Sequence, residues 1–371
     1  MRRAVLGALA GRAPRRHPPQ GRHPPRARAQ LPWRRADDID LLYGVHPVVA
    51  ALSAGSRSGG VLHVEAEARE DAGELAAQVL ELAGLHGESP LDADMAYSAM
   101  MGLGLEQRRA VAEAWERAGD APGRAAAKAA RLAARSPQAR CVVLAALSVA
   151  PFDVRWHPKA QLKQHFQNDP RGGPGHQGVV LETAALVPWD ALPALEAMLQ
   201  GGGRPVGVVL DGVTDPQNLG AIARSAAFFG ARALVLSARN CAPPSPAASK
   251  ASAGALELLA AGGGLLTADR THRVLASARE LGWAVVGAAG AEQASASPGG
   301  AGRISQGELG ALGPTLLVVG SESAGLRHVV REQCDGVVGV EGAPGRHAAL
   351  DSLNVSTATA LLLQSLCSGG V

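Results

Sequence analysis

The sequence predicts an α/β protein of two domains, of which the second is built on a parallel β-sheet. From Gly203 onward, short continuous apolar runs alternate with helical stretches, a pattern typical of parallel strands that are covered by helices on both faces. The predicted strands are residues 206–210, 233–236, 283–287, 316–319 and 337–340. The predicted helices are residues 219–229, 250–259, 273–281, 325–334 and 354–367.

A glycine-rich connector separates the two predicted domains. The run from Gln200 to Pro205 contains three consecutive glycines and few side chains that could pack, so we place the boundary between residues 200 and 201. The first domain then covers residues 37–200 and the second covers residues 201–371. A chain of 371 residues with 47% apolar side chains is long enough for two cores. No stretch of it is apolar enough for a membrane span, so we expect a soluble protein with no membrane partner.

The first 36 residues carry a charge pattern unlike that of the rest of the chain. They contain ten arginines and no acidic residue, and the arginines near the start are interleaved with Ala, Leu and Val. This composition predicts a disordered mitochondrial transit peptide and therefore a location in the mitochondrial matrix. A basic arm that binds nucleic acid is the alternative. Without these arginines the chain has 26 basic and 33 acidic residues, a net charge of −7.

The four cysteines give no sign of a metal centre. Cys141, Cys241, Cys334 and Cys367 are far apart, form no CxxC pair and have no histidine cluster beside them. We therefore expect neither a zinc site nor a disulfide framework, as is usual in a reducing compartment.

Three polar segments follow predicted strands in the second domain. They are residues 214–226, 320–326 and 352–358. Ligands of parallel sheets bind outside the carboxyl ends of the strands, so we expect the functional site there. Each segment alone has an ordinary interpretation, since Asp215 and Pro216, with Asn218 as the cap, also suit a helix start. Residues 320–325 lack the Gly-Lys-Ser/Thr ending of a P-loop, which argues against a nucleoside triphosphatase.

Taken together, the three segments resemble the motifs of a known family. The sequences DGVTDPQNLGAIARSA (211–226), VVGSESAGLR (318–327) and SLNVSTATALLL (352–363) are similar, in this order, to the three motifs of the SpoU (TrmH) branch of the SPOUT methyltransferases. Residues 239–257 also match the pattern of that family. The resemblance implies transfer of a methyl group from S-adenosylmethionine to a ribose 2′-oxygen of RNA, without a metal. It also implies a C-terminal trefoil knot and a homodimer whose interface includes helix 354–367.

Two segments of the first domain extend the resemblance. LLYGVHPVVAAL (41–52) and HQGVV (176–180) are similar to the start and end of a small RNA-binding domain, like ribosomal protein L30e, that precedes the catalytic domain in many members of this family. With the transit-like leader, this implies methylation of a guanosine in mitochondrial large-subunit rRNA, with the ribosomal large-subunit precursor as partner. A mitochondrial tRNA is a second candidate substrate. A noncatalytic RNA-binding protein of ribosome assembly is a third hypothesis, which the complete set of motif residues disfavours.

The resemblance assigns roles to five polar residues. Arg224 is implied as the catalytic residue. Because arginine stays protonated below about pH 12, we expect Arg224 to hold an RNA phosphate and to act as a base only when RNA is bound. Asn218 and Asn354 are expected to orient Arg224 and the target ribose, and Glu322 to fix an arginine or a backbone loop. Ser352 is expected at the rim of the donor pocket.

Three further positions are implied to hold S-adenosylmethionine, the expected cofactor. Backbone groups at Gly320, Val340 and Leu353 would contact the adenosine, and a glycine lets the main chain approach a ligand closely. The chain departs from the family here, because Val340-Glu341-Gly342 stands where Ile-Pro-Met is usual and a longer loop follows as far as Asp351.

One segment of the first domain has no counterpart in this resemblance. Residues 67–87 predict a helix that should turn directly into a strand near Val154, yet residues 88–153 intervene and are rich in Ala and Arg. They predict two helices, 108–116 and 125–134, within a poorly packed insertion whose removal leaves folding unharmed.

Several basic side chains of the first domain are candidate RNA contacts, and we expect none of them to be catalytic. They are His46, His157, Lys159, Lys163, His165 and His176. Because the chain without its leader is acidic, we expect modest non-specific affinity for RNA and recognition through RNA shape.

Overall fold

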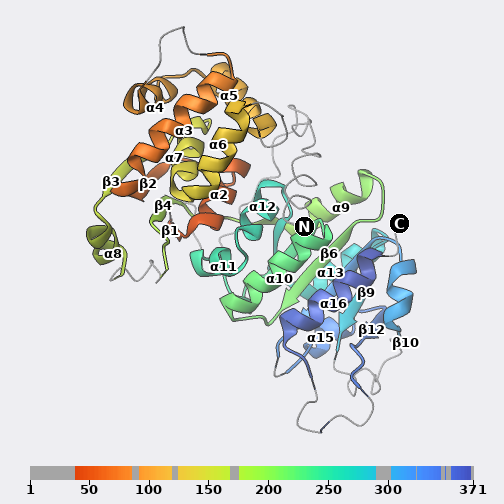
Figure 1. Cartoon of the computed structure of the whole chain (residues 1–371). Helices are drawn as coiled ribbons and strands as arrows, with labels where there is room; N and C mark the ends of the chain where they lie inside the picture. Colours follow the sequence, from red (N-terminus) through yellow and green to blue (C-terminus); the bar gives the residue numbers. More distant parts are fainter. Residues whose placement is uncertain are drawn as a thin grey trace.

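The computed structural model describes residues 38–85, 92–118, 124–167, 175–289, 302–322, 324–343, 347 and 352–368. The predicted transit peptide lies outside these residues. The described chain forms two α/β units, one on a four-stranded sheet and one on an eight-stranded sheet. Figure 1 shows the two units side by side, and helices α2 (Val45–Ala54) and α12 (Ala255–Ala261) pack together where the units meet. Within the described ranges, no helix is both long enough and apolar enough to cross a membrane.

The N-terminal sheet has the strand order β1-β4-β2-β3. The strands are β1 (Ile39–Tyr43), β2 (Gly60–Glu65), β3 (Asp153–His157) and β4 (Val179–Ala184). Strand β4 pairs antiparallel with β1 and β2, whereas β2 and β3 are parallel. Successive residues of a strand point to opposite faces, so Leu42 packs in the core shared with α2 and α3 (Arg69–Leu82) while Leu41 packs against Leu162 of α8 (Lys159–Gln167).

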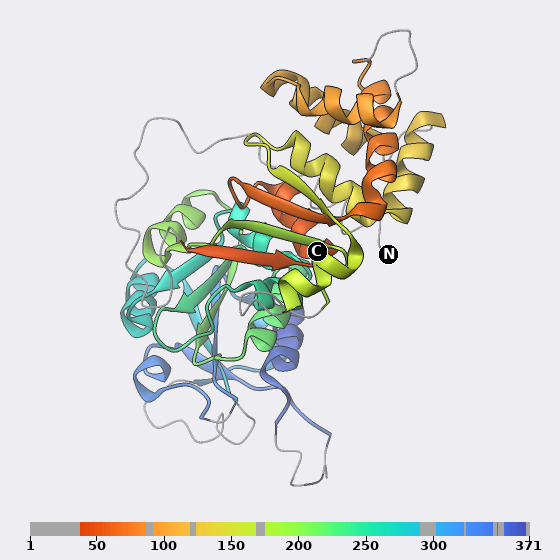
Figure 2. The same cartoon turned by 90° about the vertical axis from the view of Figure 1, so that its left-hand side faces the viewer.

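Four helices form a lobe on this unit, which we call the helical lobe. They are α4 (Ala93–Met101), α5 (Leu105–Ala118), α6 (Arg124–Arg135) and α7 (Pro137–Leu147). Figures 1 and 2 show the helical lobe at the end of the molecule that is distant from strands β10 (Gly302–Arg303) and β12 (Gly336–Val338).

The expectation that this insertion is poorly packed was wrong. Met100, Val111 and Val142 of the lobe are fully buried in the same core as Leu75 of α3. Arg108 is also buried and donates to three carbonyl oxygens within the lobe. The alanine-rich composition suggested weak packing, but small side chains let helices approach closely and bury one another.

The second unit is a sheet of eight strands in the order β10-β12-β9-β11-β6-β7-β8-β5, and every pair in it is parallel. Its remaining strands are β5 (Trp189–Asp190), β6 (Val206–Asp211), β7 (Ala233–Ser237), β8 (Leu265–Ala268), β9 (Ala284–Ala288) and β11 (Thr315–Gly320). The five strands predicted from apolar runs are β6, β7, β9, β11 and β12. The prediction of an α/β class with a parallel sheet is thereby confirmed.

Helices cover both faces of this sheet. Along β6, Val208 and Leu210 face a core that includes α10 (Pro216–Phe229), α12 and α16 (Val355–Ser368). Val209 points the other way, into a core with α9 (Ala191–Gln200) and α13 (Thr271–Glu280). Helices α10 and α16 pack against each other on their face, as Figure 1 shows. This arrangement brings together α10, which contains most of the first motif, and α16, which contains most of the third.

The second unit begins earlier in the chain than the predicted boundary at residues 200 and 201. Strand β5 pairs with β8, and α9 packs against α13 and β8. The glycine run at residues 201–203 is therefore a loop inside the second unit, between α9 and β6. Strand β5 has only two residues, which is too short to give a periodic signal in the sequence. The run of glycines was therefore the clearest sign of a domain boundary in this region.

Two predicted helices differ in the structure. The predicted helix 250–259 is divided into α11 (Pro246–Ala251) and α12, because Ala253 and Gly254 have positive φ angles of 51° and 87°. A Cβ atom on Gly254 would lie 2.5 Å from the Cβ atom of Ala50 in α2. The helix is therefore interrupted at a glycine where the two units touch. The predicted helix 325–334 is reduced to the short α15 (His328–Arg331).

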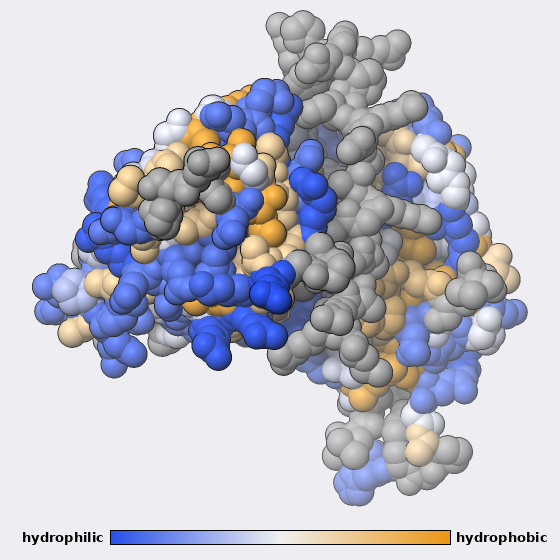
Figure 3. Space-filling model, turned by 45° about the horizontal axis from the view of Figure 1, so that its top comes forward, coloured by the Kyte–Doolittle hydropathy of each residue, from blue (hydrophilic) through white to orange (hydrophobic). Residues whose placement is uncertain are grey.

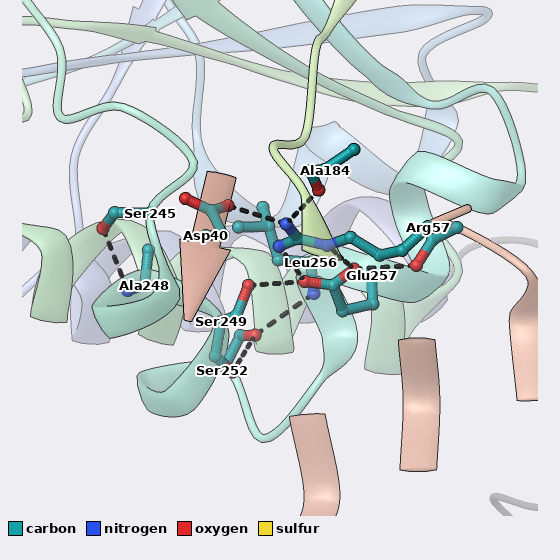
Figure 4. Close-up of polar contacts among 10 residues, drawn as sticks. Asp40, Arg57, Ala184, Ser245, Ala248, Ser249, Ser252, Leu256 and Glu257 are labelled. Atoms are coloured by element: carbon teal, nitrogen blue, oxygen red, sulfur yellow. Dashed lines mark hydrogen bonds and ion pairs between the residues drawn. The ribbon is translucent and has the colours of Figure 1, made fainter. Parts of the chain in front are cut away.

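A buried ionic cluster joins the two units (Figure 4). Arg57, in the loop between α2 and β2, donates to Asp40 at 2.6 Å and to Glu257 of α12 at 2.7 Å. The side chains of Arg57 and Glu257 are 1% and 0% exposed. Ser56 and Ser249 donate to the same Glu257 carboxylate. Burial alone would raise the pKa of Glu257, but the charge and hydrogen bonds of Arg57 and the two serine hydrogen bonds outweigh it and hold this pKa below its ordinary value.

Candidate active site

Strands β6 and β11 end side by side at one edge of the large sheet. They are adjacent and parallel, and their last residues, Asp211 and Gly320, are partners in the register. The first and second motif segments therefore leave the sheet at the same place. The third segment reaches this place from another direction, because Asn354 directly precedes α16, which packs on α10.

Asp215, rather than Asn218, caps helix α10. Its carboxylate accepts a hydrogen bond from the backbone N of Gln217 at 2.9 Å, and Pro216 occupies the first helical position. The ordinary interpretation of this segment as a helix start is therefore correct for Asp215 and Pro216. It leaves the amide of Asn218, which lies in the first turn, available for other contacts.

Glu322 joins all three motif segments. Its Oε1 atom accepts hydrogen bonds from Asn218 Nδ2 at 3.2 Å, from Asn354 Nδ2 at 2.5 Å and from the backbone N of Val355 at 3.4 Å. Asn354 Nδ2 also donates to Asn218 Oδ1 at 3.1 Å. Asn354 Oδ1 in turn accepts from the backbone N and the hydroxyl of Ser356, which fixes the first turn of α16. The structure thus brings together three of the five polar residues assigned roles from the sequence.

The loop after β11 closes on itself. Ser321 and Gly325 exchange two backbone hydrogen bonds of 3.1 and 2.9 Å, and the backbone N of Ala324 donates to Ser321 Oγ. A Cβ atom on Gly320 would lie 2.3 Å from the carbonyl oxygen of Gly325. The returning loop therefore requires glycine at position 320. The sequence suggested a different reason for this glycine, the close approach of the main chain to a ligand.

An ion pair beside this loop was missed in the sequence. Arg327 Nε donates to Asp211 Oδ2 at 2.8 Å, and a second bond joins Arg327 Nη2 to Asp211 Oδ1. The side chain of Asp211 is 0% exposed, and hydrogen bonding to it raises the pKa of Arg327. In the amide orientation that satisfies both of its groups, Asn240 accepts from Arg327 Nη1 at 3.1 Å. An aspartate at the end of an apolar strand was the available signal, since a buried carboxylate requires a partner.

Arg224 lies outside the Glu322 cluster. It follows Asn218 by six residues on α10, which places it about 9 Å further along the helix axis and about 120° around it. Its side chain is exposed, and no hydrogen-bond acceptor for it lies among the described residues. The amides of Asn218 and Asn354 contact Glu322 and each other, so the expected orientation of Arg224 by these amides is not seen in the described part of the chain.

The remaining predicted positions border the same edge of the sheet. Ser352 and Leu353 are exposed and directly precede Asn354, and the side chain of Leu353 is 49% exposed. Val340 follows β12 and packs half-buried against the main core. In the described ranges, no group of three or more His, Cys, Asp or Glu side chains is placed to hold a metal ion.

Comparison with known proteins shows which family the second unit belongs to. A family profile described as the SpoU rRNA Methylase family matches residues 205–364. The crystal structure of an AdoMet-bound rRNA methyltransferase from Sinorhizobium meliloti superposes with a TM-score of 0.50 at 16% identity, and the match covers 90% of this chain and 88% of that one. At this level of identity, the likeness concerns the fold.

Three relatives share clearer sequence identity. The human protein named "rRNA methyltransferase 1, mitochondrial" is 36% identical over 198 residues, which are 52% of this chain and 54% of the human protein. The matched part of its namesake from Saccharomyces cerevisiae is 41% of that protein, so the chain spans about half the length of these mitochondrial relatives. The 23S rRNA (guanosine-2'-O-)-methyltransferase RlmB of Pseudomonas syringae pv. tomato is 35% identical over 188 residues, 51% of this chain and 68% of that enzyme. The chain therefore belongs to the SpoU rRNA methylase family.

Proposed function

We propose that this chain transfers the methyl group of S-adenosylmethionine to the 2′-oxygen of a guanosine in mitochondrial large-subunit rRNA. The observation that carries the proposal is the joining of the three motif segments through Glu322, which hydrogen-bonds both Asn218 and Asn354. The bacterial relatives are named guanosine-2'-O-methyltransferases of 23S rRNA, and the human and yeast relatives are named mitochondrial rRNA methyltransferases.

The edge of the sheet offers groups that suit S-adenosylmethionine. Leu353 presents an exposed apolar side chain beside the polar cluster, and Val340 lies half-buried at the exit of β12, so apolar surface is available for an adenine ring. Gly320 and the folded loop after it present main chain without a side chain at the exit of β11. When bound, S-adenosylmethionine supplies a methyl group that its positive sulfur has already activated. Ser352 would lie at the rim of this pocket.

In this proposal, the protein residues orient the ribose and stabilise the charge that develops on it. Glu322 holds Asn218 and Asn354 in one orientation, so that their amides can place the ribose hydroxyl in line with the methyl group. Arg224 presents a planar guanidinium, whose donors match the oxygens of a phosphate. Its positive charge beside the target hydroxyl favours loss of the hydroxyl proton. Because free arginine stays protonated at neutral pH, it could accept that proton only in the RNA complex.

Four finer expectations belong to the same proposal. The C-terminal segment forms a trefoil knot, for which the packing of α16 on α10 and on Gln306–Ala311, with Asn354 against Glu322, is the support. Helix α16 contributes to a homodimer interface, for which the resemblance of the third motif segment is the support. The N-terminal unit acts as an L30e-like RNA-binding domain, for which its two motif segments are the support. The arginine-rich leader directs the chain to the mitochondrial matrix, where the large-subunit precursor is its partner.

Methyl transfer from labelled S-adenosylmethionine to transcribed mitochondrial large-subunit rRNA and to mitochondrial tRNAs tests the proposal. We expect label in the rRNA, with a rate about 100-fold lower for Arg224→Ala, because one charged contact at the reacting group is lost. Arg273→Ala removes an exposed arginine from α13, on the opposite face of the sheet, and should leave the rate unchanged. Label in tRNA alone would favour the second hypothesis. Binding of rRNA without any transfer would favour the noncatalytic one.

A further inference from the structure

Helix α6 of the helical lobe carries a row of basic side chains. Arg124, Lys128, Arg131 and Arg135 follow one another at spacings of four, three and four residues, and all are exposed. At 3.6 residues per turn they lie within about 60° of one another around the helix and extend over about 16 Å. We call these four residues the α6 stripe. The opposite side of the helix is buried through small side chains such as Ala129.

The segment that carries the α6 stripe has no acidic residue of its own, although the chain without its leader is acidic. From residue 121 to residue 152 the sequence has five basic residues and no acidic one. Lys128 pairs with Glu74 of α3 at 3.2 Å. For Arg124, Arg131 and Arg135, no ion pair is formed with any residue that the structure describes. With the lobe side of the molecule brought forward, the surface shows broad hydrophilic patches around smaller apolar ones (Figure 3).

The end of the α6 stripe leads to basic residues of both units. Three residues after Arg135, Gln138 donates to the carbonyl oxygen of Gln177 at 3.1 Å. The side-chain oxygen of Gln177 accepts from Lys250 of α11, in the second unit, at 2.8 Å. The amine of Lys250 lies against the start of α2, because a Cβ atom on Gly44 would lie 2.2 Å from Lys250 Nζ. The stripe and Lys250 are therefore connected through one short chain of contacts.

Further cations surround this junction. The pKa of His176 is lowered, first by burial and then by the charges of Lys163, Lys159 and Lys250, whereas Glu65 acts in the opposite direction. Each of these three lysines therefore lies near His176, although two come from α8 and one from α11. Positive charge thus continues from the helical lobe to the boundary between the units.

The same path ends next to the helix of the candidate active site. Helix α11, which carries Lys250, packs tightly on α10, because a Cβ atom on Gly220 would lie 2.4 Å from the Cβ atom of Ala251. Gly220 precedes Arg224 by one turn of α10. A strand of nucleic acid that follows the positive charge from α6 would therefore arrive beside Arg224.

We propose that the α6 stripe, continued by Lys250, binds the sugar–phosphate backbone of the substrate RNA outside the methylated nucleotide. This inference rests on the proposed function, since RNA is the substrate class proposed there. Arginine binds phosphate with two donors at once, and positions one turn apart on a helix can contact successive phosphates. The helical lobe thereby adds an RNA-binding surface to an otherwise acidic body.

The composition of the stripe favours RNA over the other partners of a basic helix. A protein interface would centre on aromatic or large aliphatic anchors, and between its basic residues α6 exposes only alanines. A membrane-surface helix inserts a large apolar face, whereas the apolar face of α6 is small and already buried in the lobe. Binding to a protein or to anionic lipid is therefore an outcome of the test and not the proposal.

The salt dependence of RNA binding tests the proposal directly. A triple variant, Arg124→Ala, Arg131→Ala and Arg135→Ala, leaves Lys128 with its partner and places good helix formers at exposed positions. The matched control removes three exposed arginines elsewhere on the same unit, Arg69→Ala, Arg109→Ala and Arg117→Ala. Binding of a fluorescein-labelled transcript of mitochondrial large-subunit rRNA to the full chain is titrated over a range of salt, without methyl donor.

We expect the triple variant to reduce the slope of log K against log salt by about 2 to 3, because each lost phosphate contact removes about 0.7 to 0.9. Its affinity at 0.1 M salt should fall at least about tenfold, while the control keeps the wild-type slope. A variant with lysine at the three positions should recover most of the slope, since it restores the charges. Equal slopes for the triple variant and the control would overturn the inference, as would binding of anionic vesicles in preference to RNA.

The outcome is separate from that of the proposed methyl transfer. Wild-type chain that binds rRNA with the predicted slope but transfers no methyl group would reject the proposed function and keep the inference. Wild-type chain that transfers methyl groups, with a triple variant that binds rRNA as tightly as the wild type, would reject the inference and keep the proposed function.

Discussion

Asn354 donates a hydrogen bond to Glu322 at 2.5 Å and thereby ties the start of α16 to the loop that follows β11. The same carboxylate oxygen accepts from Asn218 at the start of α10. One side chain therefore fixes the relative positions of three segments of the chain. The first and the last of them are far apart in the sequence, because Asn218 and Asn354 are separated by 136 positions. The position of the target ribose would depend on this carboxylate.

Glu322→Ala should slow methyl transfer about 100-fold, because misplacing the two amides by about 1 Å is enough for an effect of that size. Thermal stability should change little, because the carboxylate is exposed. The measurement is the initial rate at saturating RNA, combined with a melting curve. Gln217→Ala, an exposed neighbour of Asn218, is the control and should keep the wild-type rate. An undiminished rate in Glu322→Ala would exclude a role for this cluster.

Arg57→Met should strongly destabilise the contact between the two units. It leaves Asp40 and Glu257 as buried carboxylates without their counter-charge, a loss that costs about 3 to 5 kcal/mol. Denaturant unfolding of the variant, compared with Arg155→Ala on the exposed side of β3, measures this cost. A difference in unfolding free energy below about 1 kcal/mol, the level of a surface pair, would show that the cluster does not hold the units together.

Acid should weaken the same contact. The pKa of Glu257 is depressed in the folded chain, so its contribution to stability is present above its unfolded pKa, about 4.3, and is lost as the pH falls through the lower folded value. The contribution of Glu257 to the free energy of unfolding should therefore be constant between about pH 7 and pH 5. It should decrease below about pH 4. In Glu257→Gln this part of the acid dependence should disappear. Identical acid profiles for the two proteins would contradict the expectation.

Deletion of the helical lobe should destabilise the N-terminal unit. We predicted from the sequence that its removal leaves folding unharmed, but the structure shows that the deletion would expose Leu75 and Val79 of α3, and each such side chain contributes about 1.5 to 3 kcal/mol when buried. Replacement of residues 88–152 by a short Gly/Ser linker, followed by measurement of soluble yield and melting temperature, tests this. A linker variant as stable as the full chain would restore the original expectation.

Sequence patterns predicted the large sheet well where the strands are continuous and buried. Strands such as β6 and β11 are unbroken apolar runs, whereas β8 is only four residues long and follows a run of glycines, so it was missed. The break between α11 and α12 was also missed. It arises from the approach of Gly254 to Ala50 in the other unit, and such a tertiary constraint leaves no local periodic signal.

The candidate site shows the same division between local and tertiary information. The order of the motifs predicted that Asn218, Glu322 and Asn354 belong to one site, and the structure brings their side chains into contact; their roles stay predictions. Arg327 was not singled out, because an arginine after a loop resembles an ordinary surface charge. Only the burial of its partner, Asp211, shows why a positive charge is needed there.

Mapping the methylated position by alkaline hydrolysis is the most direct test of the central claim. A 2′-O-methyl group blocks the attack by which a ribose cleaves its own linkage, so one linkage in the methylated rRNA should resist hydrolysis. We predict a single protected linkage after a guanosine of mitochondrial large-subunit rRNA, absent when Arg224→Ala replaces the wild type. Incorporation of label with every linkage still cleaved would place the methyl group on a base and would contradict the account.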